Sequence, residues 1–73
     1  MKPQQILGSN VRRLREAKGW SQEDLAEKAN LHRTYVSGIE RGVRNPSLTI
    51  VFKLAEGLGV EPANLVNRKP TKP

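Results

Sequence analysis

Apolar residues recur along the chain at the spacing of an α-helix. Leu7, Val11 and Leu14 stand at i, i+4 and i+7, so they share one face of an amphipathic helix. A longer apolar stripe follows in the second half of the chain, at Leu48, Val51, Leu54, Ala55 and Leu58. Because no segment shows a sustained alternation of apolar and polar side chains, the pattern predicts an all-α protein.

Residues typical of helix ends divide this pattern into five short helices. The expected stops are Gly19, Asn30, Gly42 and Gly59, and the expected starts are Ser21, Ser47 and Pro62. Ser21 is the N-cap of the second helix, Asp24 can complete a capping box with it, and Trp20 can pack on Leu25 as a hydrophobic staple. We predict helices over residues 5–18, 22–29, 33–41, 48–58 and 62–66.

Length and composition indicate one small domain without a metal or cofactor. The chain has 73 residues and no cysteine, so its core must be dense because no disulfide reinforces it. We predict a folded unit over residues 1–66 and a disordered, basic, proline-rich tail over residues 67–73. The single histidine, His32, has no carboxylates at metal-ligand spacing and no catalytic partner.

The charge balance points to an anionic partner. Thirteen Lys and Arg residues against seven Asp and Glu residues give a formal net charge of +6. Nucleic acid and an anionic lipid surface both satisfy this charge, which alone does not choose between them. The first residues contain no apolar run of signal-peptide length, and no apolar stretch reaches about 18 residues. We therefore expect a cytoplasmic, soluble protein that is neither secreted nor embedded in a membrane.

Segments 22–29 and 33–41 form two short helices joined by a tight turn. Such a pair can present its second helix to the major groove of duplex DNA. The expected shared core is Leu25, Ala29, Leu31, Val36 and Ile39. The outward face of the second helix has no large apolar residue and comprises Arg33, Thr34, Ser37, Gly38 and Arg41. This face suits hydrogen bonding to base edges, with Ser37 and Gly38 allowing close approach to the groove wall.

The helix pair and its flanks resemble the XRE helix-turn-helix family of phage Cro and repressor proteins. The resemblance covers about residues 6–66 and rests on residues 21–29 (SQEDLAEKA), 36–42 (VSGIERG) and 45–48 (NPSL). Residues 31–42 (LHRTYVSGIERG) are most similar to the controller proteins of restriction-modification systems, which are small homodimeric transcription regulators. Two positions depart from the family pattern: Asn30 replaces a usual glycine, and His32 replaces a Ser or Thr that often caps the next helix.

This resemblance implies a compact five-helix domain of the lambda-repressor-like type, without enzymatic activity or a small-molecule substrate. It implies double-stranded DNA as the partner, bound by a homodimer at a palindromic operator with segment 33–41 in the major groove. The implied base contacts are Arg33, Thr34, Tyr35 and Ser37, and the implied phosphate contacts are Gln22, Arg41, Arg44 and Asn45. Arg15 and Glu40 are implied to form a structural ion pair. Two roles also follow from chemistry, since a helix N-terminus such as that at Gln22 suits a phosphate and Arg33 can pair bidentately with guanine.

Some of these residues have a second interpretation. Tyr35 can equally be a packing residue with its hydroxyl at the surface. Trp20 and Phe52 are expected in the core. Glu23, Asp24 and Glu27 form an acidic strip, which is either favourable charge near a helix start or, as in some activators of this type, a contact for RNA polymerase. Because the apolar residues of segment 48–66 exceed what a core of this size needs, some of them are expected at a subunit interface.

Two other functions stay open at this point. An antitoxin-type or other protein-interaction module, with DNA binding for autoregulation, would hold a partner protein through its last two helices and an extension longer than residues 67–73. A nonspecific binder of RNA or anionic membrane would bind without a preferred sequence and would lose binding as salt rises.

Overall fold

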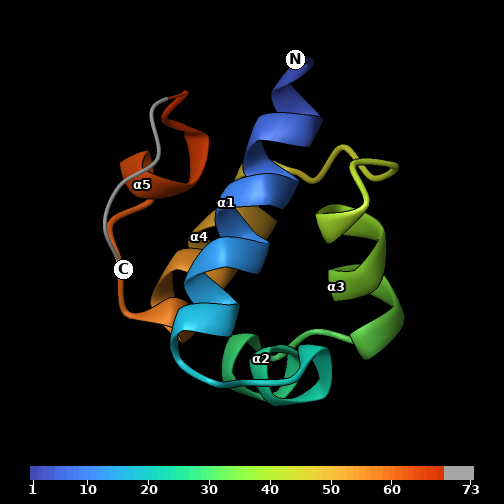
Figure 1. Ribbon diagram of the computed structural model, residues 1–73. Coiled ribbons are helices and arrows are strands. Elements are labelled where there is room, and N and C mark those ends of the chain that lie inside the picture. The colour runs from blue at the N-terminus through green and yellow to red at the C-terminus, as the bar shows by residue number, and fades with distance from the viewer. Residues whose placement is uncertain (69–73) are drawn as a thin grey trace.

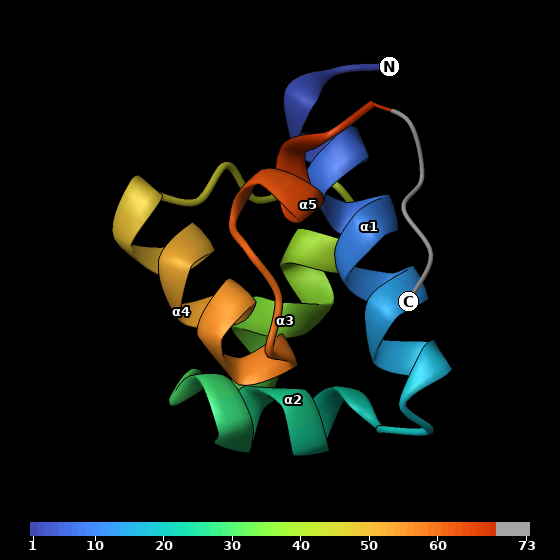
Figure 2. The same cartoon turned by 90° about the vertical axis from the view of Figure 1, so that its left-hand side faces the viewer.

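The computed structural model describes residues 1–68, which form five α-helices (Figure 1). The helices are α1 (Pro3–Ala17), α2 (Gln22–Ala29), α3 (Arg33–Glu40), α4 (Leu48–Leu58) and α5 (Ala63–Val66). In Figure 1, α3 and α5 lie on opposite sides of α1, and both pack against it. Figure 2 shows α2 across one end of the molecule, where it packs against α3 and α4. The predicted all-α class is confirmed.

Local capping explains where the helices begin. Helix α1 starts at Pro3, earlier than predicted, because proline at the first helical position gives up no helical hydrogen bond. The capping box of α2 is present as predicted: the Asp24 N–H donates to Ser21 Oγ over 3.0 Å, and the Ser21 N–H donates to Asp24 Oδ2 over 2.9 Å. Ser47 caps α4 by accepting from the Ile50 N–H.

The turn between α2 and α3 depends on two residues that depart from the family pattern. Asn30 has φ 55° and ψ 49°, the left-handed conformation expected of it. The Thr34 N–H donates to His32 Nδ1 over 3.1 Å, so the imidazole caps α3 in place of a hydroxyl. The tight turn is therefore built without the usual glycine and without the usual Ser or Thr.

A single apolar core joins all five helices. Its fully buried side chains are Val11, Leu25, Val36, Ile39, Leu54, Leu58 and Leu65. Trp20 and Leu31, which were both predicted in the core, are only partly buried and pack against its edge. The core therefore fixes α2 and α3 from beneath, through Leu25, Val36 and Ile39.

The prediction that Phe52 lies in the core was wrong. Its exposed fraction is 53%, and that of Leu48, one turn earlier on the same face of α4, is 72%. Helix α4 turns its other face, with Val51, Leu54, Ala55 and Leu58, toward the core. A helix buries one face in such a small domain, so an apolar stripe broader than that face leaves side chains in solvent.

Helices α1 and α3 approach each other closely at Gly8. A Cβ atom at this position would overlap the carbonyl oxygen of Ile39 and would lie 2.9 Å from that of Glu40. These are backbone atoms at the end of α3, and they cannot move as a flexible side chain can. The close contact of α1 with the last turn of α3 therefore requires glycine.

Asn10 attaches α5 to α1. It is the buried polar residue of the described part of the chain, and its Nδ2 donates to the carbonyl oxygens of Leu65 and Asn67, each over 2.9 Å. Asn67 thus begins the predicted tail with an anchored carbonyl, whereas residues 69–73 of that tail lie outside the described residues. Asn10 holds the C-terminal end of α5 against the domain.

We expect Asn10→Ala to lower the free energy of unfolding by about 1–3 kcal/mol, because the buried hydrogen bond to the Leu65 carbonyl and the partly buried one to the Asn67 carbonyl are both lost. Urea unfolding followed by circular dichroism measures this change. The control is Ser9→Ala, which alters the exposed neighbour on the same helix. Equal stability of the two variants would show that Asn10 does not anchor α5.

Candidate nucleic-acid interface

Helix α3 presents a polar side away from the domain. Val36 and Ile39 are fully buried beneath it, whereas Arg33 and Thr34 are exposed. Tyr35 and Ser37 are half-buried, and Tyr35 packs against the core, as its second interpretation expects. The four residues expected to contact bases are therefore all accessible on one short helix.

The prediction that Gly38 forms part of the exposed face was wrong. Gly38 is buried, and the nearest side chain to the position of a Cβ atom there is that of Arg44. Arg44 returns from the following loop and its side chain covers Gly38. From its place in the chain, Arg44 is expected in the loop alone. The sequence feature that indicates its contact with α3 is a glycine in the helix followed by an arginine just beyond the helix end.

Three exposed polar residues follow α3. Arg41 is the C-cap of the helix, and Arg44 and Asn45 stand in the loop that leads to α4. Their exposure leaves the two guanidinium groups and the amide available to an anionic backbone, next to the outward side of α3. The candidate interface thus combines a polar helix with a cationic flank.

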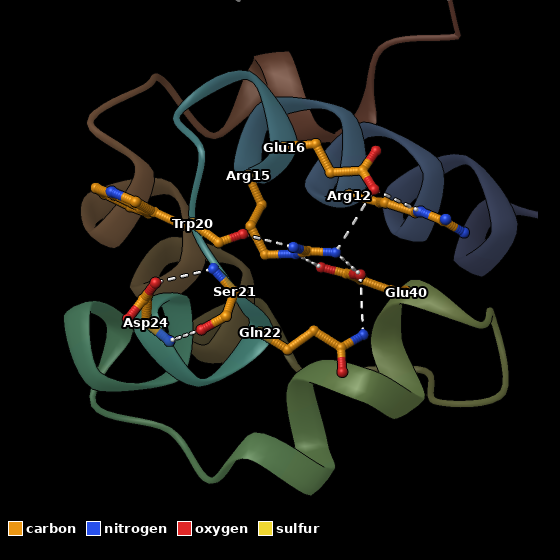
Figure 3. Close-up of polar contacts among 8 residues, drawn as sticks. All are labelled: Arg12, Arg15, Glu16, Trp20, Ser21, Gln22, Asp24 and Glu40. Carbon is orange, nitrogen blue, oxygen red and sulfur yellow. Dashed lines mark hydrogen bonds and ion pairs between the residues drawn. The ribbon is translucent and has the colours of Figure 1, made fainter.

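Gln22, expected at a phosphate, is the first residue of α2. Its Nε2 donates to Glu40 Oε1 over 3.1 Å, so its side chain spans from the start of α2 to the end of α3 (Figure 3). This contact fixes the direction of the Gln22 amide beside the N-terminal N–H groups of α2. A phosphate at that helix end would meet an oriented side chain.

Arg15 and Glu40 form a bidentate ion pair between α1 and α3. Arg15 Nε donates to Glu40 Oε2 over 2.7 Å, and Arg15 Nη2 donates to Glu40 Oε1 over 3.0 Å. The exposed side-chain fractions are 11% for Arg15 and 3% for Glu40. Arg15 Nη1 also donates to the carbonyl oxygen of Trp20 over 2.6 Å, so one guanidinium joins α1, the α1–α2 connection and α3 (Figure 3).

The ion pair removes a negative charge from the candidate interface. Hydrogen bonding to Glu40 raises the pKa of the Arg15 guanidinium, while burial opposes this effect and the charges of Glu40 and Glu16 add to it. Arg15 therefore stays charged at every pH at which the domain works, and the Glu40 carboxylate at the end of α3 is neutralised by a buried partner. The side chains of Arg33, Arg41 and Arg44 are exposed.

Two features are absent from the described residues. Within residues 1–68, no helix is long and apolar enough to cross a membrane. The same residues contain no cluster of three or more His, Cys, Asp or Glu side chains placed to hold a metal ion.

Comparison with known proteins identifies the family. The profile of the helix-turn-helix family matches residues 11–65. The chain belongs to the helix-turn-helix family. Members of this family are DNA-binding transcriptional regulators rather than enzymes, and the XRE-type resemblance seen in the sequence is confirmed.

Restriction-modification control proteins are prominent among the relatives within this family. Control protein C.BamHI of Bacillus amyloliquefaciens is 48% identical over 63 residues, which cover 85% of this chain and 78% of the relative. The crystal structure of the restriction-modification controller protein C.AhdI of Aeromonas hydrophila has a TM-score of 0.82 and 50% identity, and the match covers 85% of this chain and 94% of that one. A structure of the controller protein C.Esp1396I, a tetramer in complex with its natural 35 base-pair operator, has a TM-score of 0.82 and 37% identity over 89% of this chain and 86% of its own.

We expect Glu40→Ala to lower the free energy of unfolding by about 3–5 kcal/mol, because the Arg15 guanidinium loses the bidentate carboxylate that compensates its desolvation. The control is Arg12→Ala, which breaks an ion pair with Glu16 in which both side chains are exposed and should cost less than about 1 kcal/mol. Urea unfolding measures both variants. If the two variants lose similar amounts of unfolding free energy, the Arg15–Glu40 pair contributes no more to stability than an exposed pair does.

Proposed function

We propose that this regulator is a homodimer that acts in the cytoplasm and binds a palindromic operator, with α3 of each subunit in the major groove, to control a restriction-modification operon. The observation that carries the proposal is the polar outward side of α3, with Arg33 and Thr34 exposed above the buried Val36 and Ile39. The similarity to C.BamHI and C.AhdI supports the controller role.

The proposed contacts divide between bases and phosphates. Arg33, Thr34, Tyr35 and Ser37 on α3 are assigned to base edges, since a base edge is read by hydrogen bonds from the helix in the groove. The phosphate contacts are assigned to Gln22, Arg41, Arg44 and Asn45, which flank α3 at the start of α2 and in the following loop. Base contacts give sequence preference, whereas phosphate contacts give affinity and orientation.

The proposed subunit contact uses the exposed apolar side chains of α4. Leu48 and Phe52 stand one turn apart on the face that the core leaves uncovered. A second copy of the chain would remove this face from water, and twofold symmetry would place two α3 helices about 34 Å apart, one turn of DNA. The tetramer formed by C.Esp1396I on its operator supports self-association of such domains.

We also propose that the bound protein activates transcription through an acidic surface on α2. Glu23 and Glu27 are exposed there, whereas Asp24 is used in the capping box with Ser21. Double replacement of Glu23 and Glu27 by lysine should preserve the operator footprint and reduce transcription in vitro with purified RNA polymerase. Unchanged transcription with the variant would show that Glu23 and Glu27 do not contact RNA polymerase.

Selection of bound duplexes from a random oligonucleotide pool tests the main proposal. We expect enrichment of an inverted repeat whose half-sites are centred about one helical turn apart. A pool without enrichment would contradict sequence-specific regulation and would favour a nonspecific binder or a module whose main partner is a protein.

Two variants separate base contact from phosphate contact on the selected operator. Arg33→Ala should relax the preference at one base pair of each half-site, with about 1–3 kcal/mol of discrimination lost there. Arg44→Ala should weaken binding to all sequences alike and reduce the salt dependence of the affinity. Measured affinities for a set of single-base operator variants show which pattern each protein follows.

Phe52→Glu tests the subunit contact. A charged side chain in an apolar interface is costly to bury, so the variant should sediment as a monomer while keeping the helical content of the parent. Its operator affinity should fall by at least tenfold, because each half-site then binds alone. Glu56→Lys, an exposed charge change one turn further along α4, is the control. A dimeric Phe52→Glu protein would exclude this face from the interface.

A further inference from the structure

Gly38 and Arg44 are brought together by the backbone at the end of α3. The carbonyl oxygen of Gly38 accepts from the Val43 N–H over 3.1 Å and from the Arg44 N–H over 3.3 Å. The chain therefore folds back on α3 immediately after the helix. This return fixes the main chain of Arg44 beside Gly38.

The side chain of Arg44 occupies the space that a side chain at position 38 would take. A Cβ atom on residue 38 would lie 2.6 Å from Arg44 Cγ and 3.2 Å from Arg44 Nε. Gly38 has an ordinary helical backbone, so a left-handed conformation does not explain the glycine. The feature that does require a glycine is the close approach of Arg44.

Tyr35 also contacts the Arg44 side chain, and together Gly38 and Tyr35 form what we call the Arg44 seat. The Arg44 guanidinium carbon lies 5.2 Å from the centre of the Tyr35 ring, within the roughly 6 Å over which a cation and an aromatic face attract. Tyr35 is one turn before Gly38, so the arginine lies along α3 over both residues. A guanidinium held in this way loses less freedom on binding than one on a free loop.

We infer that Gly38 and Tyr35 are positioning residues that hold Arg44 against α3, so that Arg44 contacts DNA from the face of the recognition helix. The inference rests on the proposed function for the DNA contact itself. It replaces the expectation that Gly38 serves close approach of the helix backbone to the groove. The two roles of Gly38 predict different results in a protein that lacks Arg44. If Gly38 only positions Arg44, Gly38→Ala has no further effect on DNA affinity there, whereas if Gly38 approaches DNA directly, the substitution still lowers the affinity.

A double-mutant cycle on the selected operator separates the roles. Gly38→Ala in the otherwise unchanged protein displaces Arg44 and should lower operator affinity on the order of tenfold, as loss of a charged hydrogen bond does. Gly38→Ala added to Arg44→Ala should change affinity by less than about twofold, because no arginine remains to displace. A loss beyond that in the second background would show that the new methyl group meets DNA directly, and would overturn the inference.

Folding of the variant is checked separately. An alanine at position 38 would meet Arg44 Cγ, which rotation of the Arg44 side chain can move away, and alanine favours a helix over glycine, so Gly38→Ala should remain folded. Circular dichroism and thermal unfolding measure this. If Gly38→Ala unfolds the domain, its loss of affinity says nothing about Arg44. The NMR measurement on the free parent protein and on Tyr35→Leu then decides.

The proton chemical shifts of the Arg44 side chain show whether it lies against the Tyr35 ring in the absence of DNA. In the parent protein the methylene groups next to the guanidinium should be shifted upfield by the Tyr35 ring, and both Gly38→Ala and Tyr35→Leu should return them toward random-coil values. Absence of the shift in the parent would overturn the inference even if the operator is bound. If no operator can be selected, the proposed function is overturned. The upfield shift still tests the contact of Arg44 with Tyr35 in that case.

Discussion

The buried ion pair between Arg15 and Glu40 is the interaction on which the DNA-facing arrangement depends. The pair joins α1 to the last turn of α3. Gln22 extends the same network to the first turn of α2. Charges with so little exposed surface are costly to desolvate, and their attraction offsets that cost only when the geometry satisfies both groups. The bidentate contact and the further bond to the Trp20 carbonyl meet that condition. The consequence is a fixed relation between the two helix ends that flank the candidate interface.

Glycine at two positions then decides how closely other groups approach α3. Gly8 admits the carbonyl oxygens of Ile39 and Glu40 from the core side, and Gly38 admits the side chain of Arg44 from the outer side. The Cβ of residue 8 would meet backbone atoms, whereas the Cβ of residue 38 would meet a side chain. The two close contacts of α3 thus need glycine for different physical reasons.

Much of the fold could be predicted because local chemistry and apolar spacing agree. Ser21, Asp24, Asn30 and Ser47 each act through contacts with near neighbours in the chain, and these were predicted. Phe52 was misplaced because a sequence pattern shows which residues are apolar but not how much of a helix the remainder of a small domain can cover. Asn10 and the Gly38–Arg44 contact were missed because their partners are set by how segments return in space. For the site, resemblance to the family supplied the candidate residues, and the structure showed which of them are exposed.

The central claim is that α3 and its flanks, and not the α4 or α5 surface, meet operator DNA. The most direct measurement is a nuclear magnetic resonance titration of isotope-labelled protein with the selected duplex and with a scrambled duplex of the same length. The account predicts large amide shifts at Gln22 and through residues 33–45 with the operator, and smaller, more uniform shifts with the scrambled duplex. Shifts confined to α4 and α5, or identical shifts with the two duplexes, would contradict it.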